Sequence, residues 1–375
     1  MKILLITYSR EVNPGTFLQA FGVKLKLSEL FPEAEIELIK HKRVYSFLNN
    51  SNRQNINWTF VKSKIMAIPR RIKYEILYKK YFIFSKTEFD LFSYEFGDFK
   101  LFAESYDLIS VGSDTILTKL LDGSNGQFGL MWLEDIATRK IMFSASASPC
   151  NFVLNDAIKK RLYRVINNFD FISVRDNITF DLLKNKIGAS QIVHELPDPT
   201  FFIPDNYFIF NNRKLSKIAK YKKIALVNFG DKFKFKSNLT AYLKANSYYV
   251  ISTHFNSYAD KNFMNLNPFQ WGGLFSKIDL VVSDRFHDTV FGLRNNKIVF
   301  TLEWDDNRFS GHGKSKARDL LQKYSFESQH FIIENEVDYI RFIDFFERFE
   351  TKGIDAYDFN LQQASMLNEV NFDLL

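Results

Sequence analysis

The feature that most constrains this chain is a repeated alternation of short apolar runs with longer segments of mixed polarity. Each run ends in small or polar residues, which is typical of βα units that build a parallel sheet. A first series of runs comprises Ile3–Thr7, Ile36–Ile39, Leu108–Val111, Ile141–Phe143, Phe171–Val174 and Ile192–His194. A second series comprises Ile224–Asn228, Tyr248–Ser252, Leu280–Val282 and Val299–Thr301. The sequence therefore predicts an α/β fold with two parallel sheets.

The alternation breaks near residues 200–220, where prolines and a polar, basic stretch interrupt it. A length of 375 residues also suits two domains. We predict an N-terminal domain over residues 1–205 and a second domain over residues 220–335. We expect residues 336–375 to form a C-terminal helical segment that packs back on the first domain.

Residues 42–104 do not fit the alternation, because a short helix would suffice between the second and third runs. Lys and Arg alternate there with aromatic and aliphatic residues, which indicates a helical insertion. The simplest interpretation is a pair of helices that cover the sheet and expose their charges to solvent. Contact with an anionic membrane surface or a lipid-linked acceptor stays open. Nucleic acid is the least favoured partner, and we expect none.

The charge balance and the single cysteine limit the class of protein. A net charge of +7 favours anionic partners but does not choose among them. Because Cys150 is alone, it cannot form an intramolecular disulfide, which suits a reducing compartment. The apolar stretch after Met1 is too short for a signal peptide, and no run is long enough to span a bilayer. We expect a cytoplasmic protein.

Ligands of doubly wound sheets bind at the carboxyl ends of the strands, so the residues that follow each run are the candidates for a site. In the first domain, the turn at Asn13 and Gly15 opens a helix whose free N–H groups could bind an anion. Ser113 and Asp114 could hold a sugar hydroxyl or cap the next helix. Arg175 follows a buried run and needs an acidic partner, either Asp176 or a bound carboxylate or phosphate.

The second domain carries the sharper signal. Ser283 ends an apolar run and is a suitable N-cap, which places His287 in the first turn of a helix. An anion at that helix start would be attracted by the backbone and by an imidazolium. His254 follows the preceding run and is expected at the same edge. A flexible basic loop with Lys314 and Lys316 could close on a phosphorylated ligand. The spacing of the six histidines fits no metal site, and we expect no metal or cofactor.

Together these residues resemble the polysaccharide pyruvyl transferase family. The resemblance rests on the segments 13–20, 111–114, 173–176, 198–200, 283–287 and 314–321, in that order. It implies two Rossmann-like domains facing a cleft, an arrangement called GT-B-like. It also implies transfer of the enolpyruvyl-derived group of phosphoenolpyruvate to sugar hydroxyls, which forms a pyruvate ketal in a surface polysaccharide or its lipid-linked precursor.

The resemblance also implies roles for the candidate residues. His287 and Arg175 would be catalytic, with His287 a proton donor of near-neutral pKa. Donor binding would fall to Ser283, Lys314, Lys316, Asn13 and Gly15, and acceptor binding to Ser113, Asp114 and His254. Arg285 and Asp288 depart from the family motif and are expected to place a charge pair beside His287. The rival functions are a glycosyltransferase that uses a nucleotide-sugar and a non-catalytic carbohydrate-binding protein.

Overall fold

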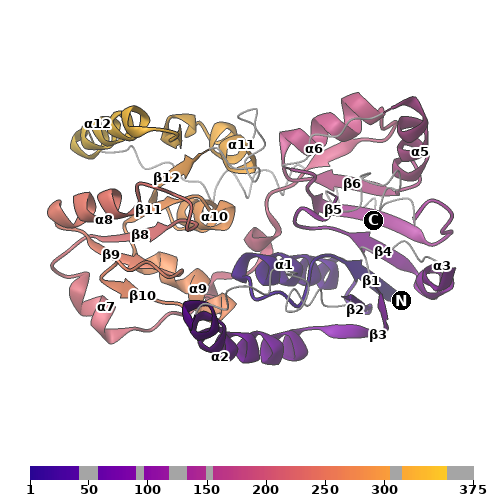
Figure 1. Cartoon of the computed structure of the whole chain (residues 1–375). Helices are drawn as coiled ribbons and strands as arrows, with labels where there is room; N and C mark the ends of the chain where they lie inside the picture. The colour runs from indigo at the N-terminus through magenta and orange to yellow at the C-terminus, as the bar shows by residue number, and fades with distance from the viewer. Residues whose placement is uncertain (42–57, 90–96, 118–132, 149–154, 305–314, 353–375) are drawn as a thin grey trace.

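The computed structural model describes residues 1–41, 58–89, 97–117, 133–148, 155–304 and 315–352. Over these residues the chain forms two lobes, each built on a parallel sheet with helices on its faces (Figure 1). Strands of such sheets are buried on both faces, which explains why they are continuous apolar runs. The predicted α/β class with two parallel sheets is confirmed.

The sheet of the first lobe has the strand order β3-β2-β1-β4-β5-β6-β7, and all its neighbouring strands are parallel. Its strands are β1 (Lys2–Ile6), β2 (Glu35–His41), β3 (Ile83–Phe89), β4 (Leu108–Val111), β5 (Arg139–Ala145), β6 (Phe171–Val174) and β7 (Val193–Glu195). Its helices are α1 (Pro14–Leu30), α2 (Trp58–Tyr81), α3 (Gly97–Ala103), α5 (Asp156–Ile166) and α6 (Asn177–Asp181), which continues as a π-helix over Leu182–Ile187.

The sheet of the second lobe has the order β10-β9-β8-β11-β12-β13 and is also parallel. Its strands are β8 (Ile224–Asn228), β9 (Tyr249–Ser252), β10 (Lys261–Asn262), β11 (Leu280–Ser283), β12 (Ile298–Glu303) and β13 (His330–Ile332). The helices are α7 (Arg213–Ile218), α8 (Lys236–Ala245), α9 (Pro268–Leu274), α10 (Phe286–Arg294), α11 (Lys316–Lys323) and α12 (Glu336–Lys352).

Two expectations about peripheral segments need correction. The insertion is helical at α2 and α3, but it also contains β3, which adds an edge strand to the first sheet. The segment that begins at residue 336 does not pack back on the first lobe over its described part. Instead, Phe342 and Phe346 of α12 surround Phe300 of β12, at ring-centroid distances of 5.7 and 5.4 Å. Residues 353–375 lie outside the described part of the chain.

The two lobes share one apolar core, and α1 lies at its centre (Figure 1). Phe17 of α1 packs edge to face on Tyr78 of α2 at 4.8 Å and on Phe269 of α9 at 5.7 Å. Arg294 of α10 reaches back to the segment between the lobes, donating to the carbonyls of Thr200 and Ile203. The segments that carry the candidate residues are therefore fixed relative to one another.

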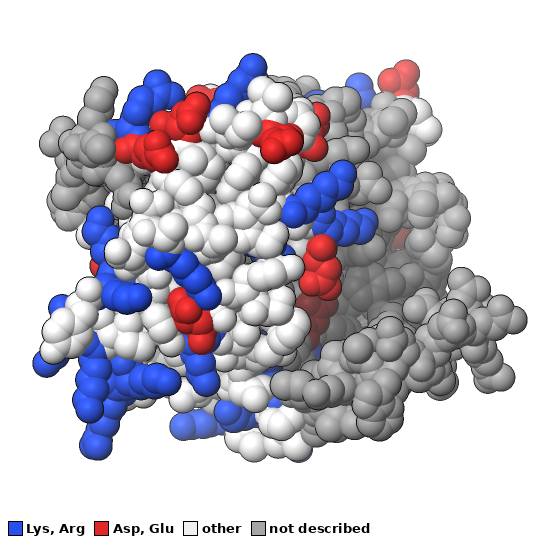
Figure 2. All heavy atoms as spheres, turned by 60° about the vertical axis from the view of Figure 1, so that its left-hand side comes forward, with Lys and Arg blue, Asp and Glu red and all other residues white. Residues whose placement is uncertain are grey.

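Positive charge is unevenly distributed over the surface. Figure 2 shows Lys and Arg gathered at the lower left of one face, whereas both signs mix along its upper edge. Residues 213–223, which include α7, contribute six exposed Lys and Arg. No helix in the described ranges is both long and apolar enough to cross a membrane.

Candidate active site

A cleft of about 590 Å³ lies between the lobes. Its wall on the first lobe is formed by the start of α1 and the loop after β4, and its wall on the second lobe by the starts of α10 and α11. This volume is in the range of small-molecule sites, which span roughly 300–1,000 Å³. The candidate residues among its lining are Asn13, Gly15, Asp114, His254, His287 and Lys316.

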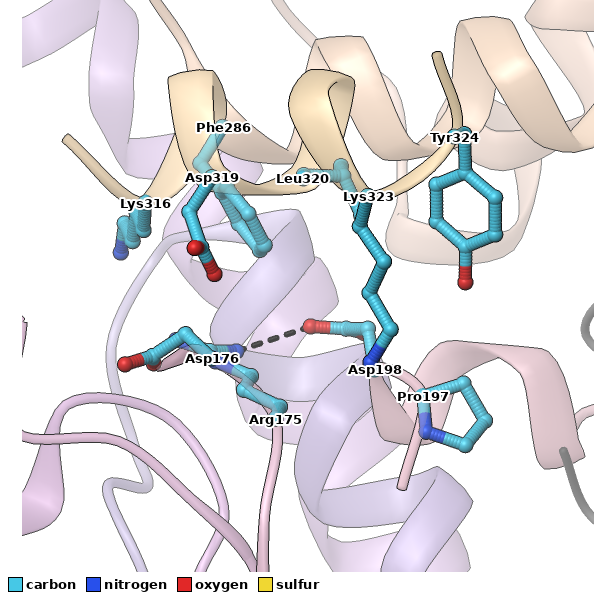
Figure 3. Close-up of a pocket in the computed structure, with 10 residues that line it drawn as sticks. All are labelled: Arg175, Asp176, Pro197, Asp198, Phe286, Lys316, Asp319, Leu320, Lys323 and Tyr324. Carbon is cyan, nitrogen blue, oxygen red and sulfur yellow. Dashed lines mark hydrogen bonds and ion pairs between the residues drawn. The ribbon is translucent and has the colours of Figure 1, made fainter. Parts of the chain in front are cut away.

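Arg175 follows β6 and is buried; it lines a small neighbouring pocket that shares Phe286 and Lys316 with the cleft (Figure 3). Its Nη1 donates to Oδ2 of Asp198 at 2.8 Å, and its guanidinium lies 4.9 Å from the ring centroid of Phe286. Asp176 is not its partner, because that carboxylate caps α6 through the N–H and hydroxyl of Thr179. Nη2 of Arg175 lies 3.6 Å from Oδ1 of Asp114, an ion pair, and its Nε has no hydrogen-bond partner.

Asp198 is the central residue that the sequence analysis did not assign. Its Oδ2 accepts from Arg175 and, at 2.9 Å, from Nε2 of Gln19, while its Oδ1 accepts from the backbone and hydroxyl of Thr200. Burial opposes ionisation, but the charge of Arg175, the interaction with His287 and the hydrogen bonds from Thr200 outweigh it and lower the pKa of Asp198. The side chain is therefore a permanent buried carboxylate that orients the groups around it.

His287 lies in the first turn of α10, as expected from the spacing. Its ring sits against Gly15 of α1, where a Cβ atom would lie only 2.1 Å from Nδ1. Its Nε2 is 2.6 Å from Nε2 of Gln19 and 3.9 Å from Oδ2 of Asp198. Because that same Oδ2 binds Arg175, the structure brings the two predicted catalytic side chains to one carboxylate from opposite lobes.

The expected near-neutral pKa of His287 is wrong. Burial lowers its pKa to about 4, Asp198 and Asp114 raise it in part, and Lys316 and Arg175 lower it again. The ring is therefore neutral at pH 7. This state agrees with the contact to Gln19, whose amide can donate one hydrogen to Asp198 and the other to a deprotonated Nε2.

Lys316 begins α11 and supplies a second cation to the cleft. Its Nζ lies 4.9 Å from the Phe286 centroid, the same distance as the Arg175 guanidinium. Burial and the charge of Arg175 lower the pKa of Lys316 to about 8. Asp114 faces this group: burial disfavours its charge, yet Lys316, Arg175 and His287 lower its pKa overall. Two cations and two carboxylates therefore meet in one partly buried space.

Two predicted residues do not reach the cleft surface. Ser283 ends β11 and is fully buried, and its hydroxyl lies 2.6 Å from the Asp288 carboxylate. Arg285, rather than Ser283, is the N-cap residue of α10. Ser113 is also fully buried, and its carbonyl accepts from the hydroxyl of Thr7. Both residues support the backbone of the site and are not placed to touch a ligand.

The expected charge pair between Arg285 and Asp288 is absent from the described residues. Arg285 pairs with Asp284, with Nε 3.0 Å from Oδ1. Asp288 instead accepts hydrogen bonds from Asn228 and Ser283 inside the lobe, and burial raises its pKa to about 6. The two departures from the family motif therefore act on different sides of α10.

The remaining candidates occupy structural or more distant positions. Asn13 is the N-cap of α1 and accepts from the backbone of Gly15 at 3.0 Å. His254 lines the cleft on the second lobe. Lys314 lies outside the described residues. No group of three or more His, Cys, Asp or Glu side chains that could hold a metal ion occurs in the described part of the chain.

Two parallel-sheet lobes with a ligand-sized cleft between them define the GT-B-like class. Solved structures agree with this fold at low identity. A putative UDP-N-acetylglucosamine 2-epimerase from Listeria monocytogenes has a TM-score of 0.57 at 10% identity, covering 99% of this chain and 97% of that one. The S. aureus MnaA–UDP co-structure has a TM-score of 0.57 at 13% identity, covering 100% and 96%. The Methanocaldococcus jannaschii UDP-GlcNAc 2-epimerase in complex with UDP-GlcNAc and UDP has a TM-score of 0.53 at 9% identity, covering 99% and 100%.

The family follows from the sequence itself. The model of the polysaccharide pyruvyl transferase family matches residues 13–306, a span that begins at the N-cap of α1 and includes Arg175, Asp198 and His287. The chain belongs to this family and is therefore a transferase. No curated protein matches it in sequence.

Proposed function

We propose that the protein transfers the pyruvyl group of phosphoenolpyruvate to two hydroxyls of a sugar, forming a pyruvate ketal and releasing inorganic phosphate. The observation that supports this most directly is the convergence of Arg175, Lys316 and His287 around Asp114, at the edge of the cleft, in a chain of this family. The donor carries a phosphate and a carboxylate, so it needs several cations. The guanidinium of Arg175 and the ammonium of Lys316 suit these groups.

The reaction requires a proton at the methylene carbon while a sugar oxygen attacks the adjacent carbon. The C–O bond to the phosphate then breaks, the second sugar oxygen takes its place, and the proton of that second hydroxyl leaves with the phosphate. His287 would be protonated once the charges of the donor have raised its pKa, and Asp198 would stabilise this imidazolium until the proton reaches the methylene carbon. Asp114 would orient the first acceptor hydroxyl and accept its proton. We propose no metal or cofactor for this reaction.

The first experiment measures phosphate release and acceptor mass with phosphoenolpyruvate and a panel of saccharides. Arg175→Gln should weaken donor binding roughly tenfold to a hundredfold, because it removes a charge-assisted contact of about 1.5–3 kcal/mol. Unchanged donor affinity in this variant would remove Arg175 from the donor site. A folded protein that neither binds phosphoenolpyruvate nor forms a pyruvylated product would contradict the proposal.

A second candidate is a glycosyltransferase that uses a nucleotide-sugar. It is favoured only by the fold, because structures of the same class are described with UDP or UDP-GlcNAc. Thermal-shift titrations separate the two functions: stabilisation by phosphoenolpyruvate supports the pyruvyl transferase, and stabilisation by nucleotide-sugars alone supports the glycosyltransferase.

We also propose that the protein is cytoplasmic and contacts the membrane surface through α2. Ile72 and Ile76 are 54% and 59% exposed on the face that also carries Lys79 and Lys80. Tyr74, on the opposite face, is buried. Exposed aliphatic side chains flanked by lysines suit an anionic lipid surface, and an acceptor carried by lipid would be presented there.

A further inference from the structure

The cleft continues beyond the proposed donor residues to a second group of basic side chains. Arg70 reaches it from α2 of the first lobe, whereas His254 follows β9 and Arg285 follows β11 of the second lobe. All three line the same 590 Å³ cleft as His287 and Lys316. The basic group therefore spans both lobes, and we call Arg70, His254 and Arg285 the distal basic cluster.

The positive charge of the distal basic cluster is only partly neutralised. Within the described ranges no carboxylate lies at ion-pair distance from Arg70, and its Nε has no hydrogen-bond partner. Nδ1 of His254 is also buried without a partner. Burial and the charges of Arg285, Arg70 and Lys236 lower the pKa of His254 to about 3, so three cations act on this ring. Such a ring is neutral at pH 7 and can donate one hydrogen bond to an anion.

The carboxylates that line the cleft nearby are already engaged elsewhere. Asp284 pairs with Arg285 and accepts from the backbone of Gly230 at 3.1 Å. Asp288 accepts from Asn228 and Ser283. Glu303 lies 2.9 Å from Nε2 of His330. None of these contacts uses Arg70, whose guanidinium lies 5.7 Å from the ring centroid of Tyr74 and faces no carboxylate among the described residues.

We propose that the distal basic cluster binds a phosphate or diphosphate group of the acceptor, so that the sugar is presented as a phosphorylated or diphosphate-linked saccharide. This inference rests on the proposed function, because it assigns the donor to Lys316 and the neighbouring Arg175 and leaves the distal basic cluster for the acceptor. A neutral saccharide would give no reason for a second cationic group in the same cleft. Arg70 and Arg285 supply the charge, and His254 supplies a directed N–H.

The test uses inorganic pyrophosphate as the probe and calorimetry on the full chain, with phosphoenolpyruvate present at saturation. Arg70→Gln should weaken pyrophosphate binding by about tenfold to a hundredfold. Arg71→Gln is the matched control, because Arg71 is an exposed neighbour on α2 that does not line the cleft. Phosphoenolpyruvate affinity and the melting temperature should match the parent in both variants.

Two further ligands distinguish the source of the phosphate. Uridine diphosphate represents a nucleotide-linked sugar, and farnesyl diphosphate in detergent represents a lipid-linked one. Arg70-dependent binding of either supports the proposal and identifies the source. Two results would overturn the proposal. One is displacement of pyrophosphate by phosphoenolpyruvate in a one-to-one ratio. The other is equal pyrophosphate affinity of the Arg70→Gln and Arg71→Gln variants. Arg70-dependent pyrophosphate binding without any phosphoenolpyruvate binding would instead retain the anion site and refute the proposed function.

Discussion

Replacing His287 by Gln tests whether this side chain becomes the proton donor only when the donor substrate is bound. Burial lowers its pKa to about 4, so about one ring in a thousand carries a proton at pH 7. A proton donor works best with a pKa near the working pH. The bound substrate must therefore raise the pKa of His287 by about three units, which corresponds to about 4 kcal/mol.

This coupling fixes the sign of the pH dependence of donor binding. A group whose pKa rises on binding takes up a proton, so affinity is greatest at low pH and falls as pH rises toward the pKa of the complex. For His287 the parent should lose up to tenfold in donor affinity per unit between about pH 5 and 7, beyond the loss caused by the donor's own titration. Above the pKa of the complex the curve should become flat.

Calorimetry with phosphoenolpyruvate across this pH range measures the coupling, and the His287→Gln variant reports the donor's own titration. The variant should bind donor with a shallower pH dependence and turn over about two to four powers of ten more slowly at saturation. Identical pH slopes in the parent and the variant would refute proton uptake by His287. Near-parental turnover in the variant would refute its role as the acid.

Three further changes test other parts of the site. Since the pKa of Lys316 is about 8, donor affinity should fall as pH rises above about 8, because the side chain loses its charge. Lys316→Arg should abolish this alkaline decline in affinity. A decline that persists in the variant would show that another group causes it. Gly15→Ala introduces a Cβ atom 2.1 Å from Nδ1 of His287, so the ring must move. Turnover should drop while the melting temperature stays within a few degrees of the parent. Parental kinetics in this variant would mean that the position of the ring is unimportant. Replacing Lys79 and Lys80 by Glu should reduce sedimentation with anionic liposomes without changing activity on a soluble acceptor, and equal sedimentation would leave α2 as a plain solvent-exposed helix.

The strands found from the sequence are those with continuous apolar runs. β3, β10 and β13 were missed because each lies at or near a sheet edge and lacks such a run. β3 has only Ser85 buried, with Ile83 53% exposed, and β10 has only two residues. The mixed polarity of β3 therefore did not separate it from the helical pattern of residues 42–104 around it.

The candidate site was recovered where a residue follows a central strand, as Arg175 and Asp114 do. Asp198 was not assigned, because the prolines that flank it indicate only a stiff turn, and nothing local shows that its carboxylate receives Arg175 from 23 positions away. Gln19 gave a weak signal that could have been used: it is a polar residue on the most apolar part of α1. The near-neutral pKa expected for His287 failed because burial between two lobes cannot be deduced from one segment.

The apolar core that the two lobes share also has a thermodynamic consequence. Leu5 of β1 and Val281 of β11 belong to the same buried cluster, joined through α1 and α9. Either lobe produced alone would expose part of that cluster to water, so neither lobe is an autonomous folding unit. Heat should therefore unfold the chain in a single transition. A ligand in the cleft then stabilises the far edges of both sheets as much as the residues it touches.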